Sequence, residues 1–281
     1  LRTLLGFCAF LGCRFTRPLE ENLGLFSQGG GFFQGLGEEA GDAVGIDVDE
    51  GAERKGTGGG VAGAAGDALG AEVEFISREQ ILNKFGVNGI QQYAPCYGGL
   101  GKITDDTQMT LFTAEGLIID WYKQNLHGQG HMPSQFKNAY LRWLATQNNS
   151  SIQKEGFLHA YKDMYSRRAP GNTCLTGLQQ IARQNTFVAS NNSKGCGTIM
   201  RVAPVAIMAH ASLNHDMQSS DIEQSFDWVY EQSIVSAALT HGHPTGQIAA
   251  AAFALILFAV LCGQSMPKAC DLALLHIQQK E

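Results

Sequence analysis

The chain of 281 residues is 44% hydrophobic, which is enough apolar material to bury a sizeable core. Its formal net charge of −6, without any stretch rich in lysine or arginine, argues against a nucleic-acid partner bound through its phosphates. We therefore expect a small-molecule or protein ligand and no nucleic acid. A monomer is the simplest expectation for the assembly.

The first part of the chain differs in composition from the remainder. Residues 1–58 contain few periodic apolar runs, and 15 of the chain's 34 glycines fall within the first 60 residues. We interpret residues 1–58 as a poorly ordered leader and residues 59–281 as the domain. An export signal over Leu4–Gly12 remains an alternative, although Arg2 alone would supply its basic region.

From residue 60 onward, apolar residues recur three and four positions apart, which predicts helices separated by loops rich in Gly, Pro, Asn and Ser. Few segments alternate with a period of two, and β-branched residues rarely cluster, so we expect a compact all-α domain of many helices. The predicted helices are Val61–Leu69, Arg78–Phe85, Asp105–Gln124, Pro133–Thr146, Leu175–Gln184, Val202–Ala211, Ser225–Thr240 and Gln247–Cys262.

The first predicted helix opens on a glycine pattern that has an alternative interpretation. Gly58, Gly60 and Gly63 match the G-x-G-x-x-G pattern of dinucleotide-binding folds. That fingerprint requires a hydrophobic strand directly before the first glycine, and residues 51–56 contain none. A nucleotide-binding oxidoreductase is therefore only a minor alternative. Glu74, just past this helix, is either a solvated loop acid or a side chain turned back toward a cavity.

The segment Ile103–Thr110 places a hydroxyl and two adjacent carboxylates at a helix N-terminus. Thr104 or Asp105 would serve as the N-cap, and Gln108 would complete a capping box with Asp105. The same oxygen atoms, with no thiol or imidazole beside them, suit a hard cation such as Mg²⁺ or Mn²⁺. A helix cap and a metal site both remain open on spacing alone.

Two later loops carry more polar chemistry than a helix connection requires. The two glycines of Asn191–Arg201 free backbone amides to face an anion, although the loop lacks the ending of a P-loop. Its Cys196 is more typical of a packing residue than of a nucleophile, because no histidine base is evident beside it. In Thr240–Pro244 we favour ligand contact by His241 over a zinc site, with a solvent-facing histidine pair as the alternative.

The cysteines and the longest apolar run bear on the location of the protein. The seven cysteines are scattered and form no C-x-x-C pair, which favours a reducing, cytoplasmic setting. The run Ile248–Cys262 is shorter than the ~20 residues that span a bilayer. It therefore predicts a buried central helix, and no membrane partner is expected.

Five segments, taken in order, resemble the ADP-ribosylglycohydrolase family, which includes dinitrogenase-reductase-activating glycohydrolase and the ADP-ribosylhydrolases. None of them is specific alone, whereas five in the right order over residues 60–263 are. The resemblance does not extend to residues 1–58. The segments are Gly63–Phe75, Thr104–Thr110, Arg168–Asn172, Gly195–Pro204 and Leu239–Pro244.

The resemblance implies an all-α fold with two divalent cations, Mg²⁺ or Mn²⁺, in a cleft that binds ADP-ribose. The implied reaction is hydrolysis of the bond between the distal ribose and a protein side chain, so the partner would be ADP-ribose or an ADP-ribosylated protein. On this basis Thr104, Asp105 and Asp106 would be metal ligands, and Glu74 and Asp106 the catalytic acids. The implied substrate-binding residues are Asn192, Ser193, Lys194, Gly195, Cys196, Gly197, Arg201 and His241.

One expected motif has no counterpart in this sequence. The family carries a second acidic motif, of the type Gly-Asp-(Asp/Ser/Thr)-Asp-Thr, after the His-Gly-His segment, whereas only Asp271 follows Pro267 here. The resemblance is thus to a C-terminally truncated member with half of the metal ligands. A non-catalytic ADP-ribose-binding protein is the alternative function. The acceptor residue of the cleaved bond is not predicted.

Overall fold

The computed structural model describes residues 54–148, 150, 155–213 and 219–280. These residues form helices and turns and no β-strand, apart from an isolated bridge between Cys96 and Gly99. The predicted all-α fold is therefore confirmed. The helices are α3 Arg54–Gly70, α4 Arg78–Phe85, α5 Asp105–His127, α6 Met132–Asn148, α7 Asn172–Gln184, α8 Ala203–Ser212, α9 Ser219–Ala238, α10 Pro244–Leu261 and α11 Met266–Lys280, with 3-10 turns η1 Leu158–Ala160, η2 Lys162–Tyr165 and η3 Ile199–Arg201.

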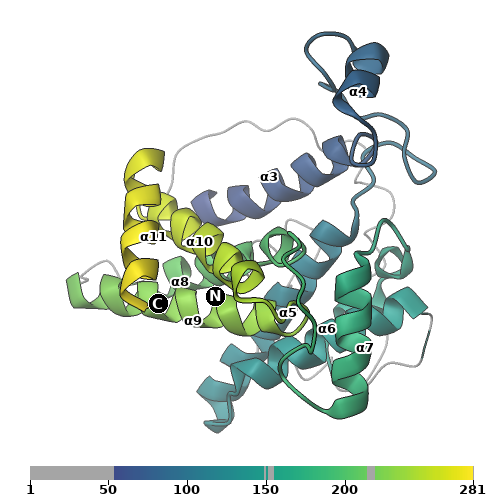
Figure 1. Ribbon diagram of the computed structural model, residues 1–281. Helices are drawn as coiled ribbons and strands as arrows, with labels where there is room; N and C mark the ends of the chain where they lie inside the picture. Colours follow the sequence, from purple (N-terminus) through teal and green to yellow (C-terminus); the bar gives the residue numbers. More distant parts are fainter. Residues whose placement is uncertain (1–53, 149, 151–154, 214–218, 281) are drawn as a thin grey trace.

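Helix α5 lies at the centre of the domain. Most of its side chains from Asp105 to Ile119 are buried, and it packs against α3, α6 and α8. Helix α10 forms a second centre, in contact with α8, α9 and α11. Figure 1 shows α10 and α11 side by side, whereas α4 projects from the body of the molecule and contains no buried residue. The core therefore surrounds α5 and α10.

The structure confirms some predicted boundaries and corrects others. Helix α4 has the predicted bounds because Ser77 and Gln80 form a capping box at its start. Helix α3 begins at Arg54, so residues 54–58 belong to a helix and not to the leader, while residues 1–53 lie outside the described part. The pattern Gly58–Gly63 lies inside α3 instead of a strand-to-helix loop, which removes the support for a dinucleotide fold.

Helix α11 was not predicted from the sequence. Its buried residues are Ala269, Ala273 and His276, whereas Leu274 and Leu275 are 57% and 54% exposed. Because two of the three inward-facing side chains are alanines and the third is polar, the helical period of hydrophobicity is weak.

The predicted central helix is α10. Its N-cap is His243, and the Nδ1 atom of this residue accepts a hydrogen bond from the Thr245 amide. By length and composition α10 could cross a membrane. Its buried residues, mainly alanines with Leu255 and Phe258, pack against neighbouring helices, and the core helix of a globular protein meets the same criteria.

A buried ion pair fastens the chain after α6 to the core. The Glu115 carboxylate in α5 accepts two hydrogen bonds from Arg142 in α6, at 2.8 and 2.6 Å, and both side chains are at most 4% exposed. Its other oxygen accepts the amides of Phe157 and Leu158 at 2.6 and 2.8 Å. Since all four donors depend on one carboxylate, its loss would leave a buried guanidinium unpaired.

We predict that Glu115→Ala lowers the free energy of unfolding by about 3–5 kcal/mol, because the Arg142 charge stays buried without a partner. Chemical denaturation followed by circular dichroism measures this loss. The matched control is Glu155→Ala, which breaks the exposed pair between Lys123 and Glu155 and should remove less than about 1 kcal/mol. Equal losses in the two variants would contradict the anchoring role of Glu115.

Candidate active site

Thr104, one of the two residues predicted as the N-cap, caps the start of α5. The Thr104 hydroxyl accepts a hydrogen bond from the Asp106 amide at 3.3 Å, and its backbone is extended. The capping box predicted between Asp105 and Gln108 is wrong, because the Gln108 side chain turns into the core. Thr104 therefore caps the helix, and the side chains of Asp105 and Gln108 make other contacts.

Gln108 instead ties the first turn of α5 to the segment before α7. Its fully buried amide donates to the carbonyls of Ser166, at 2.8 Å, and Asp163, at 3.4 Å. Its carbonyl oxygen accepts from Trp143 and Gln147 in α6, at 3.2 and 3.1 Å. Because every hydrogen-bonding position of this amide is used, the side chain fixes the rotation of α5 about its axis.

The Asp67 carboxylate of α3 also binds the first turn of α5. Its Oδ1 accepts the Thr104 hydroxyl at 2.7 Å, and its Oδ2 accepts the Thr104 amide at 2.9 Å. Its Oδ2 also accepts the amide and hydroxyl of Thr107, at 3.2 and 2.6 Å. The sequence shows that Asp67 is near the end of α3, but not that it meets α5.

The two carboxylates at the start of α5 lie in an acidic, poorly solvated environment. Burial raises the pKa of Asp105 to about 7, with the Gly171 amide opposing this and the charges of Asp106 and Glu74 adding to it. Burial, followed by the charges of Asp67 and Glu74, raises the pKa of Asp106 to about 6. Both side chains would bind a proton or a cation near neutral pH.

Glu74 lies in the turn that follows α3 and faces this acidic group of residues. Partial burial, then the charge of Asp67, raises the pKa of Glu74, although its side chain remains largely exposed. Tyr97, which the sequence analysis did not single out, lies close to the same acids. Burial raises the pKa of Tyr97, and the charges of Cys96, Glu74, Asp105 and Asp67 raise it further. Glu74 is thus both near the α5 carboxylates and open to water.

The donor set at this turn suits a hard cation in type but is incomplete. Thr104, Asp105 and Asp106 offer oxygen atoms, and burial, with neighbouring negative charges, disfavours the free carboxylates there. Among the described residues, however, no three histidine, cysteine or carboxylate side chains are placed to hold a metal ion. The turn therefore fits part of a coordination sphere, and the remaining ligands would come from water, substrate or other residues.

Hydrogen bonds connect this turn to the glycine loop, residues 189–197. The Asp105 carboxylate accepts the amide of Gly171, the N-cap of α7, at 3.2 Å. One residue into α7, the Thr173 hydroxyl lies 3.3 Å from the Ser193 hydroxyl of the loop. The predicted metal and substrate segments are thus brought together through the start of α7.

The glycine loop packs against the turn Thr240–Gly246. Asn191 links the two: its amide donates to the Thr240 carbonyl at 2.8 Å, and its Oδ1 accepts the amides of Ser193 and Gly242 at 3.1 Å each. Of the predicted substrate contacts, Ser193 and Gly197 are half-buried, whereas the side of the loop that faces solvent consists of Asn192, Lys194, Gly195 and Cys196.

His241 lies beneath the glycine loop. It is 1% exposed, and its Nδ1 lies 2.8 Å from the Thr240 hydroxyl. A side chain at Gly195 or Gly197 would meet its ring, so these glycines allow the loop to lie directly on it. Burial, followed by the Arg201 charge, lowers the pKa of His241 to about 4, which keeps the ring neutral. It supports the loop, and a ligand would reach it only through the loop.

Arg201 does not lie where substrate contact was predicted. Its guanidinium is fully buried, donates to the Ser236 carbonyl at 2.9 Å and the Thr240 hydroxyl at 2.7 Å, and stacks over the Tyr140 ring at 4.5 Å. This burial does not fit the predicted contact between Arg201 and substrate. The Arg201 side chain turns away from the loop into the core, where its hydrogen bonds join η3 to α9.

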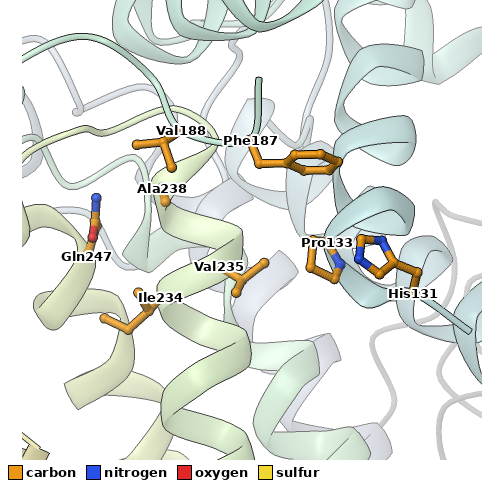
Figure 2. A pocket seen from close by; sticks show the side chains of 8 residues that line it. All are labelled: His131, Pro133, Phe187, Val188, Ile234, Val235, Ala238 and Gln247. Atoms are coloured by element: carbon orange, nitrogen blue, oxygen red, sulfur yellow. The ribbon is translucent and has the colours of Figure 1, made fainter. Parts of the chain in front are cut away.

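A separate apolar pocket of about 480 Å³ is lined by α9, the start of α6, the segment after α7 and one residue of α10 (Figure 2). The Gln247 amide in its wall donates to the His241 carbonyl at 2.9 Å, so the pocket borders the site without containing any of its acids. The residues that line it are His131, Pro133, Phe187, Val188, Ile234, Val235, Ala238 and Gln247.

The raised pKa of Asp105 predicts the pH dependence of stability in metal-free buffer. An acid whose folded pKa is about 7, against an ordinary 3.8, stabilises the fold at low pH, and this contribution is lost as the pH rises through 7. The melting temperature of the metal-free chain should therefore fall between pH 5 and pH 8. Asp105→Asn should make that fall smaller, whereas Asp271→Asn on exposed α11 should not. An unchanged fall in Asp105→Asn would contradict the assignment.

The contact between the two loops predicts a second effect. A Cβ atom at Gly242 would overlap the carbonyl oxygens of Asn191 and Ala189, so Gly242→Ala should push the glycine loop outward and destabilise the fold by roughly 1–3 kcal/mol. Gly66→Ala in α3, where a Cβ atom meets open space, is the matched control and should not destabilise. Thermal melting compares the two, and equal stability would show that the loop yields freely.

The comparisons with known proteins bear on the family of the chain. A sequence model of the family described as ADP-ribosylglycohydrolase matches residues 49–281. The ADP-ribosyl-dinitrogen reductase glycohydrolase of Rhodospirillum rubrum is 27% identical over 216 residues, which are 74% of this chain and 58% of the relative. An uncharacterized protein of Archaeoglobus fulgidus is 29% identical over 202 residues, 71% of this chain and 52% of the relative.

An ADP-ribosylarginine hydrolase of Serratia proteamaculans is 27% identical over 177 residues, which are 62% of this chain and 42% of the relative. The chain thus spans about half the length of the curated relatives it matches. The family match covers most of its residues and all of the site segments described above. The chain belongs to the ADP-ribosylglycohydrolase family.

Proposed function

We propose that the protein hydrolyses the bond between ADP-ribose and a protein side chain with the help of Mg²⁺ or Mn²⁺. The observation that carries this proposal is the carboxylate pair at the start of α5, which has raised pKa values and lies across the start of α7 from the glycine loop. Relatives named for removal of ADP-ribose from dinitrogen reductase and from arginine support the class of substrate.

In this proposal Thr104, Asp105 and Asp106 hold the cation through oxygen atoms, which Mg²⁺ and Mn²⁺ prefer. When bound, the cation would orient the hydroxyls of the distal ribose and stabilise negative charge on oxygen. The buried network of Gln108 keeps the turn rigid, so the ligand oxygens stay in place during the reaction.

The acid–base step falls to a carboxylate beside this turn. Cleavage at the anomeric carbon builds oxocarbenium character, and an attacking water must lose a proton to a nearby base. Glu74 has a raised pKa and is open to water, and Asp106 lies close to it, so either carboxylate could accept that proton. The glycine loop would wrap the diphosphate with backbone amides and the Lys194 ammonium group.

A second candidate function is ADP-ribose binding without hydrolysis. It is favoured by the incomplete donor set among the described residues. In that case the glycine loop and the Thr240–Gly246 turn would hold the ligand, and no cation would be needed. Calorimetry with free ADP-ribose separates the two: affinity that is the same with Mg²⁺ and with EDTA favours binding alone.

The free cysteine thiols bear on the cellular compartment in which the protein acts. The cysteines of the described residues, Cys96, Cys174, Cys196, Cys262 and Cys270, are all unpaired. Free thiols in several environments suit a reducing compartment, and we propose a cytoplasmic location and a monomer that acts on ADP-ribosylated proteins.

Release of ADP-ribose from ADP-ribosylated protein tests the main proposal. We expect release with Mn²⁺ or Mg²⁺ and none with EDTA, and we expect Asp106→Ala to lower the metal-dependent rate by roughly 100-fold or more, because it removes a ligand and a candidate base. Asp271→Ala, which removes an exposed carboxylate of α11, should keep the rate. Release that persists in EDTA, or in Asp106→Ala at the same rate, would remove the cation from the mechanism.

A further inference from the structure

We propose that Asp67 is a positioning residue for the cation: it fixes the direction of the Thr104 hydroxyl so that the oxygen lone pairs face the metal site. This inference rests on the proposed function, in which Thr104 is a ligand. It extends that function to a residue of α3 which the motif at the start of α5 does not include.

The direction of the Thr104 proton carries the argument. A hydroxyl has one proton and two lone pairs, and a cation can be coordinated only by the lone pairs. The Asp67 carboxylate cannot donate, so the 2.7 Å contact between its Oδ1 and Thr104 Oγ1 requires the hydroxyl to donate toward α3. The proton therefore points toward Asp67, and the weak 3.3 Å contact from the Asp106 amide leaves lone-pair density on Thr104 Oγ1 for a cation.

The same geometry argues that Asp67 acts through Thr104 and is not itself a ligand. Its Oδ2 already accepts three donors, the Thr104 amide and the amide and hydroxyl of Thr107, and its Oδ1 accepts the Thr104 hydroxyl. Four donors equal in number the usual accepting positions of a carboxylate, and only Oδ1 keeps one lone pair without a donor. This is the arrangement in which an outer carboxylate orients a metal ligand by a hydrogen bond.

Asp67 also has a structural role, and the two roles can be separated through Thr107. The contacts to Thr107 join α3 to α5 at a residue that is not a predicted ligand. Loss of the Thr107 hydroxyl should therefore weaken the junction between the helices without changing the direction of the Thr104 proton. Loss of Asp67 should change both.

The test is the Mn²⁺ affinity of the whole chain, measured by calorimetry without substrate. In Asp67→Asn, an amide nitrogen that faces Thr104 would donate to its hydroxyl and turn the proton toward the cation. We expect the Mn²⁺ dissociation constant to rise by roughly 10- to 100-fold. In a Thr104→Ala background, the same Asp67 change should alter affinity by less than about threefold, because the two residues act as one unit.

Two variants serve as controls. Thr107→Val should lower the melting temperature but leave Mn²⁺ affinity within about threefold of wild type, and Glu79→Gln, which removes an exposed charge in α4, should alter neither. Circular dichroism confirms that each variant is folded. Thr104→Ser keeps a hydroxyl and should retain most of the affinity.

The outcomes distinguish this inference from the proposed function. If wild type binds Mn²⁺ and Asp67→Asn binds it equally well, the inference is overturned while the metal site stands. If the Asp67 effect persists undiminished in Thr104→Ala, Asp67 acts through its charge alone, and the positioning role is wrong. If wild type binds no Mn²⁺, the proposed metal site and this inference both fail.

Discussion

The site depends on the burial of α5. Because this helix is enclosed by α3, α6 and α8, its first turn carries into the protein interior whatever residues begin it. Two of those residues are carboxylates, and the amides at a helix N-terminus offset only part of the unfavourable free energy of placing their charge there. The raised pKa values of Asp105 and Asp106 are the consequence. A bound proton or a bound cation would each relieve this unfavourable charge, and the proposed metal site relies on the cation.

Much of the architecture was accessible from the sequence because it follows local rules. A capping box gave α4 its bounds, and apolar periodicity gave α5 through α10, with ends displaced by a few residues. The order of five short segments identified the family, since such an order is improbable by chance. In the structure, hydrogen bonds join the start of α5 to the start of α7 and the start of α7 to the glycine loop.

The parts that sequence reasoning missed depend on contacts between distant residues. Gln108 looked like half of a capping box, because only the fold shows that Trp143 and Gln147 surround it. Arg201 was expected to contact substrate, because only the fold shows that its guanidinium enters the core beside Tyr140. In both cases the residue type allowed two roles, and long-range packing chose between them. A short-range pattern contains no information about that choice.

Helix α3 is made of residues that favour a helix weakly, since glycine occupies seven of its 17 positions and each destabilises a helix by about 1 kcal/mol relative to alanine. Its order must come from packing on α5 and α8 and from the four hydrogen bonds of Asp67. The end of α3 and the first turn of α5 should therefore open as one cooperative unit. Native-state hydrogen exchange at the Thr104 and Thr107 amides would then report the folding of α3 as well as their own protection.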